Sequence, residues 1–149
     1  MTHRRAGPWT ATLAAVALAA GCSTSPDAHD YREQASLTLG TATSEVATVR
    51  LVLSELADGD TLRPAAMTQL RYSEDSLGST AQSFGTLNPP GSADRVHRRS
   101  STLLGEAEDL LAEVRIAVHR ESTADYRTLL RDLDALATRL ESLERQVAP

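Results

Sequence analysis

Residues 126–147 read YRTLLRDLDALATRLESLERQV. Large apolar side chains recur in this stretch at alternating steps of three and four residues: Tyr126, Leu129, Leu133, Leu136, Leu140, Leu143 and Val147. A spacing that averages 3.5 residues places them along one side of an α-helix, whereas a half-buried strand would have a period of two. Charged residues occupy much of the remainder, so the opposite side is expected to face water. The stretch therefore predicts an amphipathic helix whose apolar seam needs partners.

Three upstream segments carry seams with the same spacing. The first ends at Asp58-Gly59-Asp60, the second begins near Pro64, which fits a first helical turn, and the third begins near Ser92, a residue type suited to capping. Ser122 is expected to cap the fourth helix in a capping box with Asp125. The seam residues are Ala35, Leu39, Ala42, Val46, Val49, Leu53 and Leu56 in the first segment, Ala66, Leu70, Ser73, Leu77, Thr80 and Phe84 in the second, and Val96, Ser100, Leu103, Ala107, Leu110, Val114 and Ala117 in the third, which Leu104, Leu111 and Val118 widen.

Four helices of roughly 22 to 28 residues, joined by connections of about three to seven residues, favour one arrangement. Short connections force consecutive helices to run in opposite directions, so the sequence predicts an all-α fold, an antiparallel up-down-up-down four-helix bundle over residues 30–149. An alternative stays open, in which two helical hairpins dimerise to complete the bundle, because the first two seams contain small residues. The chain is accordingly expected to be a monomer or a homodimer.

The N-terminus has a different composition. Arg4 and Arg5 precede the run ATLAAVALAA at residues 11–20, which contains no charged residue. A membrane-spanning helix needs about 20 apolar residues, and this run is half that length. A basic start and a short apolar run are typical of a cleaved signal peptide. Small residues then lead directly into Cys22, the only cysteine in the chain.

The pentapeptide Leu18-Ala19-Ala20-Gly21-Cys22 resembles the lipobox of bacterial lipoproteins, in which a leucine and two small residues precede the cysteine. Leu18 lies one place earlier than in that pattern, and Ala19 takes the place of the leucine. The resemblance implies that residues 1–21 are a lipoprotein signal peptide and that Cys22 receives a diacylglyceryl thioether and becomes the mature N-terminus. Residues 22–29 are then the lipidated cysteine and a flexible tether. An ordinary secretory signal cut near the same place is the alternative.

The composition is typical of a GC-rich genome such as that of an actinobacterium. All 15 basic residues are arginine and alanine is abundant. With this composition and the lipobox, the chain resembles small actinobacterial lipoproteins. Two or three acyl chains on Cys22 would hold the domain at the extracytoplasmic face of the cell membrane. Without residues 1–21 the chain has 13 arginines against 20 acidic residues, a net charge of 13 − 20 = −7, so no nucleic acid is expected as a partner.

The sequence contains no pattern typical of a catalytic, cofactor or metal site. His29 lies in the expected tether, and His97 follows the seam residue Val96 by one position, so it is expected to face solvent. Asp94-x-x-His97 is single, whereas bundle metal sites pair Glu-x-x-His motifs on two helices. No Gly-x-Ser-x-Gly turn is present. We therefore expect no enzyme, no cofactor, and no catalytic or metal-binding residue.

Arg95, Arg98 and Arg99 crowd the start of the third helix, where the helix dipole disfavours each positive charge by about 0.3 to 1 kcal/mol. In an up-down bundle anchored at Cys22, this end lies beside the anchor. The three arginines are therefore candidates for contact with the membrane or a partner, since anionic lipid attracts each basic side chain by about 1 kcal/mol. Pairing with acidic residues at the same end is the alternative, and the candidates are Asp94, Glu141 and Glu144.

The sequence thus predicts a membrane-anchored extracytoplasmic lipoprotein whose bundle is a non-enzymatic interaction module, with a possible protein partner at the cell envelope. The alternative is a small-ligand carrier or sensor with a cavity between its helices. Such a cavity would be lined by small residues of the seams, namely Ala35, Ala42, Ser73, Thr80 and Ser100. A pocket of several hundred Å³ lined by these residues would favour the carrier.

Overall fold

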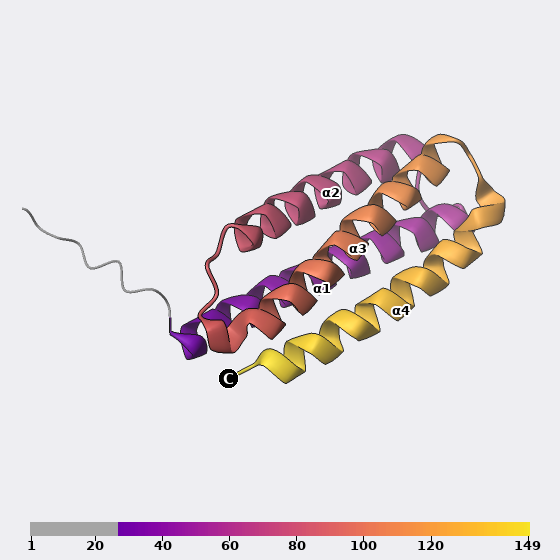
Figure 1. Cartoon of the computed structure of the whole chain (residues 1–149). Helices are drawn as coiled ribbons and strands as arrows, with labels where there is room; N and C mark the ends of the chain where they lie inside the picture. Colours follow the sequence, from indigo (N-terminus) through magenta and orange to yellow (C-terminus); the bar gives the residue numbers. More distant parts are fainter. Residues whose placement is uncertain (1–26) are drawn as a thin grey trace, which may run out of the picture.

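The computed structural model describes residues 27–149, and the predicted signal peptide, lipobox and Cys22 lie outside them. Within this range no strand is present, and consecutive helices run in opposite directions along one bundle (Figure 1). The predicted all-α, up-down-up-down four-helix bundle is confirmed, with one chain supplying all four helices. The elements are α1 (Ala28–Asp58), α2 (Arg63–Gly85), the short 3₁₀ helix η1 (Gly91–Ala93), α3 (Asp94–His119) and α4 (Thr123–Val147).

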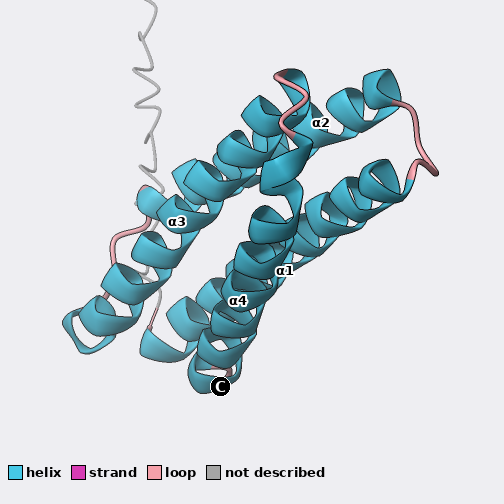
Figure 2. Ribbon diagram, turned by 90° about the vertical axis from the view of Figure 1, so that its right-hand side faces the viewer, coloured by secondary structure: helices cyan, strands magenta, loops and turns pink. Residues whose placement is uncertain are grey.

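The two ends of the bundle carry different connections. The start of α1, the end of α2, the start of α3 and the end of α4 meet at one end, which we call the N-terminal pole. The α1–α2 and α3–α4 turns lie at the other end, the distal pole (Figure 2). Helix α1 contacts the other three helices, whereas α2 and α4 do not touch each other among the described residues. Helices α1 and α3 therefore separate α2 from α4.

The seams form the core as predicted. All seven seam residues of α4 are buried, as are Leu104, Leu111 and Val118, which widen the seam of α3. Four seam positions lie at the edge of the core and are only partly buried, namely Leu56, Thr80, Val96 and Leu110. None of the helices in residues 27–149 combines the length and the hydropathy needed to cross a bilayer.

Helix α1 begins earlier than the sequence predicted. The Asp27 carboxylate accepts hydrogen bonds from the backbone N–H groups of His29 and Asp30, at 2.8 and 2.9 Å. These bonds hold the pKa of Asp27 below its usual value and satisfy two donors at the helix start. His29 therefore lies in the first turn of α1. The tether was expected to extend to residue 29, but Ala28 and His29 belong to the helix.

Two capping predictions are correct and two are wrong. Gly59 ends α1 at φ 81°, the left-handed conformation that favours glycine, and Pro64 lies in the first turn of α2. Ser92 does not cap α3, because it lies inside η1 and Ala93 takes the capping position. Ser122 makes no side-chain cap, since its backbone carbonyl accepts the Asp125 N–H at 3.0 Å.

Candidate functional site

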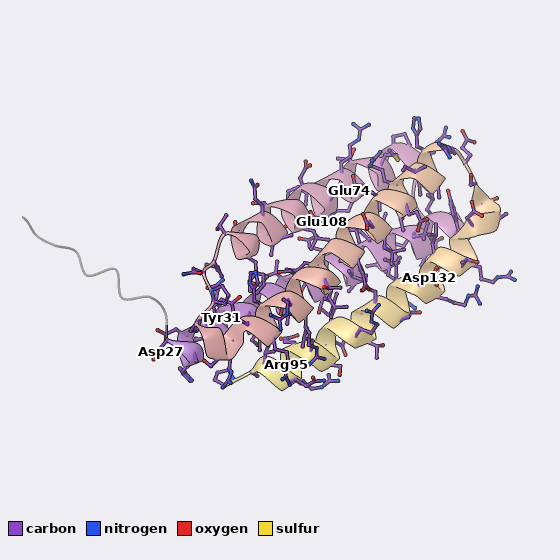
Figure 3. The ribbon with its side chains drawn as sticks, in the orientation of Figure 1. Asp27, Tyr31, Glu74, Arg95, Glu108 and Asp132 are labelled. Atoms are coloured by element: carbon purple, nitrogen blue, oxygen red, sulfur yellow. The ribbon has the colours of Figure 1, made fainter. Side chains whose placement is uncertain are left out.

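The three candidate arginines lie at the N-terminal pole. Arg95, Arg98 and Arg99 are exposed on the first two turns of α3. Figure 3 shows Arg95 at the same end of the bundle as Asp27, the residue from which α1 starts. Among residues 27–149, none of the three arginines forms an ion pair. Their guanidinium groups therefore remain available for another anion.

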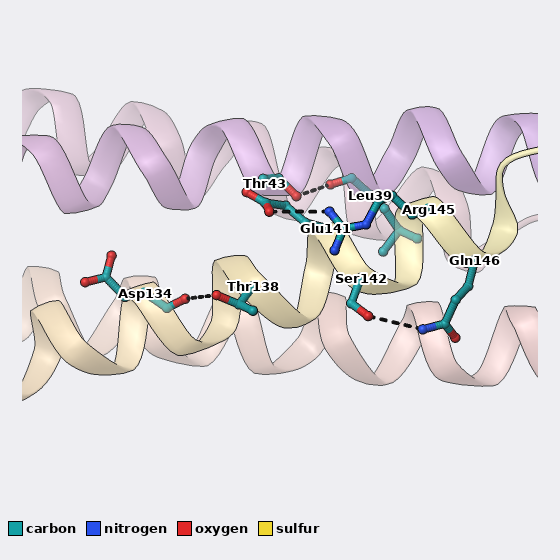
Figure 4. A network of polar contacts seen from close by, with 8 residues as sticks. All are labelled: Leu39, Thr43, Asp134, Thr138, Glu141, Ser142, Arg145 and Gln146. Carbon is teal, nitrogen blue, oxygen red and sulfur yellow. Dashed lines mark hydrogen bonds and ion pairs between the residues drawn. The ribbon is translucent and has the colours of Figure 1, made fainter.

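The carboxylates proposed as partners have other surroundings. Glu141 pairs with Arg145 at 3.6 Å. Glu144 lies against α1, where a Cβ on Gly40 would stand only 3.1 Å from its Oε1 atom. Figure 4 shows Glu141 and Arg145 on the α1 side of α4, and Ser142 with Gln146 on the α3 side. Asp94 makes no ion pair with any described residue, so the ion-pair alternative is not observed.

Two of the three arginines line a groove between α3 and α4. Its volume is about 380 Å³, and the nearly buried side chains of Leu103 and Leu143 contribute an apolar surface. Arg95 is not part of this groove. We call this space the arginine groove. Its lining residues are Arg98, Arg99, Thr102 and Leu103 from α3, and Arg139, Ser142 and Leu143 from α4.

Hydrogen bonds fix the orientation of the polar groups in the arginine groove. Arg99 Nη1 donates to Gln146 Oε1 at 3.1 Å, and Gln146 Nε2 donates to Ser142 Oγ at 3.1 Å. Ser142 is thus an acceptor in this chain, which leaves its own O–H available as a donor. The Thr102 hydroxyl is occupied, because it donates to the Arg98 carbonyl at 2.9 Å.

The third arginine of the groove is already compensated. Arg139 binds Glu106 with both terminal nitrogens, and the Nη2 to Oε1 distance is 3.0 Å. This hydrogen bonding raises the pKa of Arg139 above its usual value. The uncompensated positive charge of the groove therefore belongs to Arg98 and Arg99.

The sequence identified only half of this site. Arg98 and Arg99 stood out because they oppose the helix dipole, whereas Arg139, Ser142 and Gln146 resemble any solvated positions of an amphipathic helix. Their spacing of three and four residues does put them on one side of α4. The predicted bundle already brings the end of α4 beside the start of α3, but the sequence does not show which side chains of α4 face α3 and which face α1.

A second groove runs between α1 and α2 near the same pole. Its volume is about 440 Å³, and no charged residue lines it. The sequence segments 34–44 and 76–93, which supply its residues, contain no charged residue at all. We call it the hydroxyl groove, lined by Gln34, Leu37, Thr38, Thr41, Ser79, Thr80, Ser83, Phe84 and Leu87.

An aromatic cluster joins α1, α2 and α3 at the N-terminal pole. Tyr31 Oη lies 2.6 Å from His97 Nδ1, and the Phe84 ring stacks on His97 with centroids 5.3 Å apart. Burial, reinforced by the negative charge of Asp94, raises the pKa of Tyr31 to about 12. The expectation that His97 faces solvent is wrong, because the first turn of α1 and the last of α2 converge on it.

The small seam residues that were expected to line a carrier cavity are mostly packed. Ala35, Ala42, Ser73 and Ser100 are fully buried, and only Thr80 lines a groove, the hydroxyl groove. The Ser73 and Ser100 hydroxyls have no hydrogen-bond partner among the described residues. No group of three potential metal ligands occurs within residues 27–149.

Comparisons of the chain with protein-family models, with curated proteins and with solved structures give no match. Function is therefore inferred from the chemistry of the surfaces at the N-terminal pole.

Proposed function

We propose that the chain is a lipoprotein of the extracytoplasmic face of the cell membrane, tethered by lipid on Cys22, and that its bundle is a non-enzymatic interaction module. One observation carries the proposal: the start of α1, which a tether from Cys22 would join, lies at the same pole as three arginines that form no ion pair among residues 27–149. Five residue steps separate Cys22 from Asp27 and span at most about 18 Å when fully extended. Lipid on Cys22 would hold this pole close to the bilayer.

The packing of the small seam residues supports an interaction surface over a carrier. Four of the five residues that a carrier cavity would need are fully buried in the core. Large apolar side chains are also exposed on α1, α2 and the turn between them. They are Leu37, Leu51, Leu62 and Tyr72, which are 56 to 77% exposed.

The chemistry of the two grooves supports a binding role. Neither groove is lined by a histidine or a thiol, so the serines and threonines that line them have no base beside them. Guanidinium groups over an apolar surface can bind and orient an anionic molecule without reacting with it.

The tether is tested by expressing the full chain in an actinobacterial host fed an alkyne-tagged fatty acid. We expect the wild-type chain to carry the tag and to fractionate with the membrane. Cys22→Ala should lose the tag and appear as an unprocessed or released protein, while the neighbouring Ser23→Ala variant should behave like wild type. Tagged, membrane-bound Cys22→Ala protein would refute the proposal.

A further inference from the structure

We propose that the arginine groove binds the phosphate of an anionic phospholipid headgroup in the membrane to which the protein is tethered. The lipid source rests on the proposed function, whereas the affinity of the groove for the headgroup depends only on residues of α3 and α4. The occupant follows from the charge, the free donors and the apolar surface of the groove, and from its place in the bundle.

Charge complementarity comes from Arg98 and Arg99. Both are exposed, and neither pairs with a carboxylate among residues 27–149. Guanidinium groups bind phosphate oxygens through pairs of parallel hydrogen bonds, which makes arginine well suited to this anion. The first turns of α3 add the positive end of the helix dipole. A bound phosphate would therefore relieve the unfavourable placement of these arginines.

An uncharged donor faces the same space from α4. Ser142 accepts a hydrogen bond from Gln146, so its own O–H can be donated to a phosphate oxygen. Gln146 also accepts from Arg99, which links the serine to the guanidinium across the groove. Arg139 is held by Glu106 and lines the same space. The groove thus presents two free cations and one oriented hydroxyl.

The apolar surface favours a lipid over free phosphate. Leu103 and Leu143 line the groove beneath the polar groups and are 8 and 2% exposed. The glycerol and first methylene groups of a phospholipid would cover these side chains, whereas inorganic phosphate would leave them facing water.

The position of the groove allows a headgroup to reach it. Arg98 lies four residues after the start of α3, and Ser142 lies five residues before the end of α4. At about 1.5 Å per residue, these side chains project within about 8 Å of the helix ends at the N-terminal pole. A headgroup at the bilayer surface is therefore within reach when the α3–α4 side leans toward the membrane.

The test uses residues 23–149 without lipid, since every residue of the core cluster lies between Tyr31 and Val147 and the bundle closes on itself. Binding is measured to vesicles of equimolar phosphatidylglycerol and phosphatidylcholine. Arg98→Gln with Arg99→Gln should weaken binding about 30-fold. The matched control pair, Arg71→Gln with Arg127→Gln, removes two exposed arginines outside the groove that form no ion pair within residues 27–149, and should weaken vesicle binding less than about threefold. Equal losses in both pairs would refute a site in the groove.

A charge-neutral variant separates a built site from general attraction. Ser142→Ala removes the uncharged donor and should weaken vesicle binding about three- to tenfold. Its melting temperature should not fall, because alanine favours the helix. General electrostatic attraction predicts no effect of Ser142→Ala on binding, and that result would overturn the proposal.

Inorganic phosphate provides the arm that identifies the source of the anion. We expect millimolar phosphate to compete only weakly with the vesicles, because it leaves the apolar surface uncovered. Tight binding of inorganic phosphate that depends on Arg98 and Arg99, without vesicle binding, would overturn the lipid assignment. Absence of lipid on Cys22 would leave these results unchanged, so failure of the tether and failure of the groove are distinguishable.

Discussion

The two grooves at the N-terminal pole are similar in size and opposite in chemistry. The hydroxyl groove between α1 and α2 and the arginine groove between α3 and α4 measure about 440 and 380 Å³. Polar side chains line both. In the hydroxyl groove, Thr38 and Thr41 donate to the carbonyls of Gln34 and Leu37, one turn earlier, at 2.8 and 3.0 Å. These hydroxyls are already satisfied by their own helix.

The arginine groove differs because the guanidinium donors of Arg98 and Arg99 are not satisfied by the carbonyls of their own helix. A guanidinium group has five N–H donors on a long side chain and cannot return to the carbonyl of its own preceding turn as a threonine does. The nearby acids Glu141 and Glu144 lie toward α1. The comparison shows that the number of polar groups does not decide which groove binds a ligand. The unpaired positive charge of the lining residues does, because the hydroxyls of Ser79, Thr80 and Ser83 in the hydroxyl groove also donate no hydrogen bond to a described residue.

The largest expected effect is the loss of stability when a core leucine is truncated, compared with an exposed leucine of the hydroxyl groove. Leu140 on α4 is fully buried, whereas Leu37 on the hydroxyl groove is 62% exposed. Leu140→Ala should lower the free energy of unfolding by about 2 to 5 kcal/mol. Leu37→Ala should change it by less than about 0.5 kcal/mol. Chemical denaturation monitored by circular dichroism measures both, and a comparable cost for Leu37→Ala would mean that the hydroxyl groove is closed by a tighter contact than described.

Moving the charge from one groove to the other tests the comparison directly. Ser79→Arg and Ser83→Arg, introduced together with Arg98→Gln and Arg99→Gln, keep the net charge but place the cations on the exposed rim of the hydroxyl groove. We expect this variant to regain less than about a third of the vesicle affinity that Arg98→Gln with Arg99→Gln loses. The reason is that the hydroxyl groove lacks the polar groups with which α3 and α4 line the arginine groove. Full recovery would mean that charge at this pole is sufficient.

The aromatic cluster joins α1, α2 and α3 at the N-terminal pole, and removing one oxygen atom from it should lower the stability of the bundle. Tyr31→Phe removes the hydroxyl that bonds to His97 and should lower the free energy of unfolding by about 1 to 2 kcal/mol at neutral pH. The raised pKa of Tyr31, about 12, means that the native state retains the proton longer than the unfolded chain does. Wild-type stability should therefore fall between pH 10 and 12.

Tyr31→Phe should lose part of that alkaline decrease, and the rest belongs to Tyr126, whose pKa burial also raises. Denaturation curves at pH 8, 10 and 11 compare the two proteins. An identical alkaline decrease in the variant would contradict the assignment of the high pKa to Tyr31.

The smallest expected effect concerns the compensated arginine. Glu106→Gln releases Arg139 from its carboxylate and should increase binding to anionic vesicles about two- to fivefold. The free energy of unfolding should change by less than about 1 kcal/mol, because the pair is largely exposed. Glu108→Gln, an exposed neighbour outside the arginine groove, is the control. Equal gains in both variants would show that only net charge matters.

The parts of the structure that depend on the spacing of residues along one helix were predictable from the sequence. A seam such as Leu129 to Val147 follows from helical periodicity alone, and the seams together required an up-down bundle. His97 was misassigned because its burial depends on three helix ends that meet in space. Arg139 and Ser142 were missed for the same reason, since their relation to Arg98 exists only after α3 and α4 are paired.

The most direct test of the central claim is the orientation, on a bilayer, of the chain carrying lipid on Cys22. Single cysteines replacing Ala148, at the end of α4, and Ser83, on the hydroxyl groove, carry a fluorophore whose transfer to a lipid-bound acceptor reports distance from the surface. Phosphatidylglycerol in place of phosphatidylcholine should bring the Ala148 label closer and move the Ser83 label away. Arg98→Gln with Arg99→Gln should abolish that difference. Labels that keep the same depths in both lipids would contradict the claim that the arginine groove faces and binds the membrane.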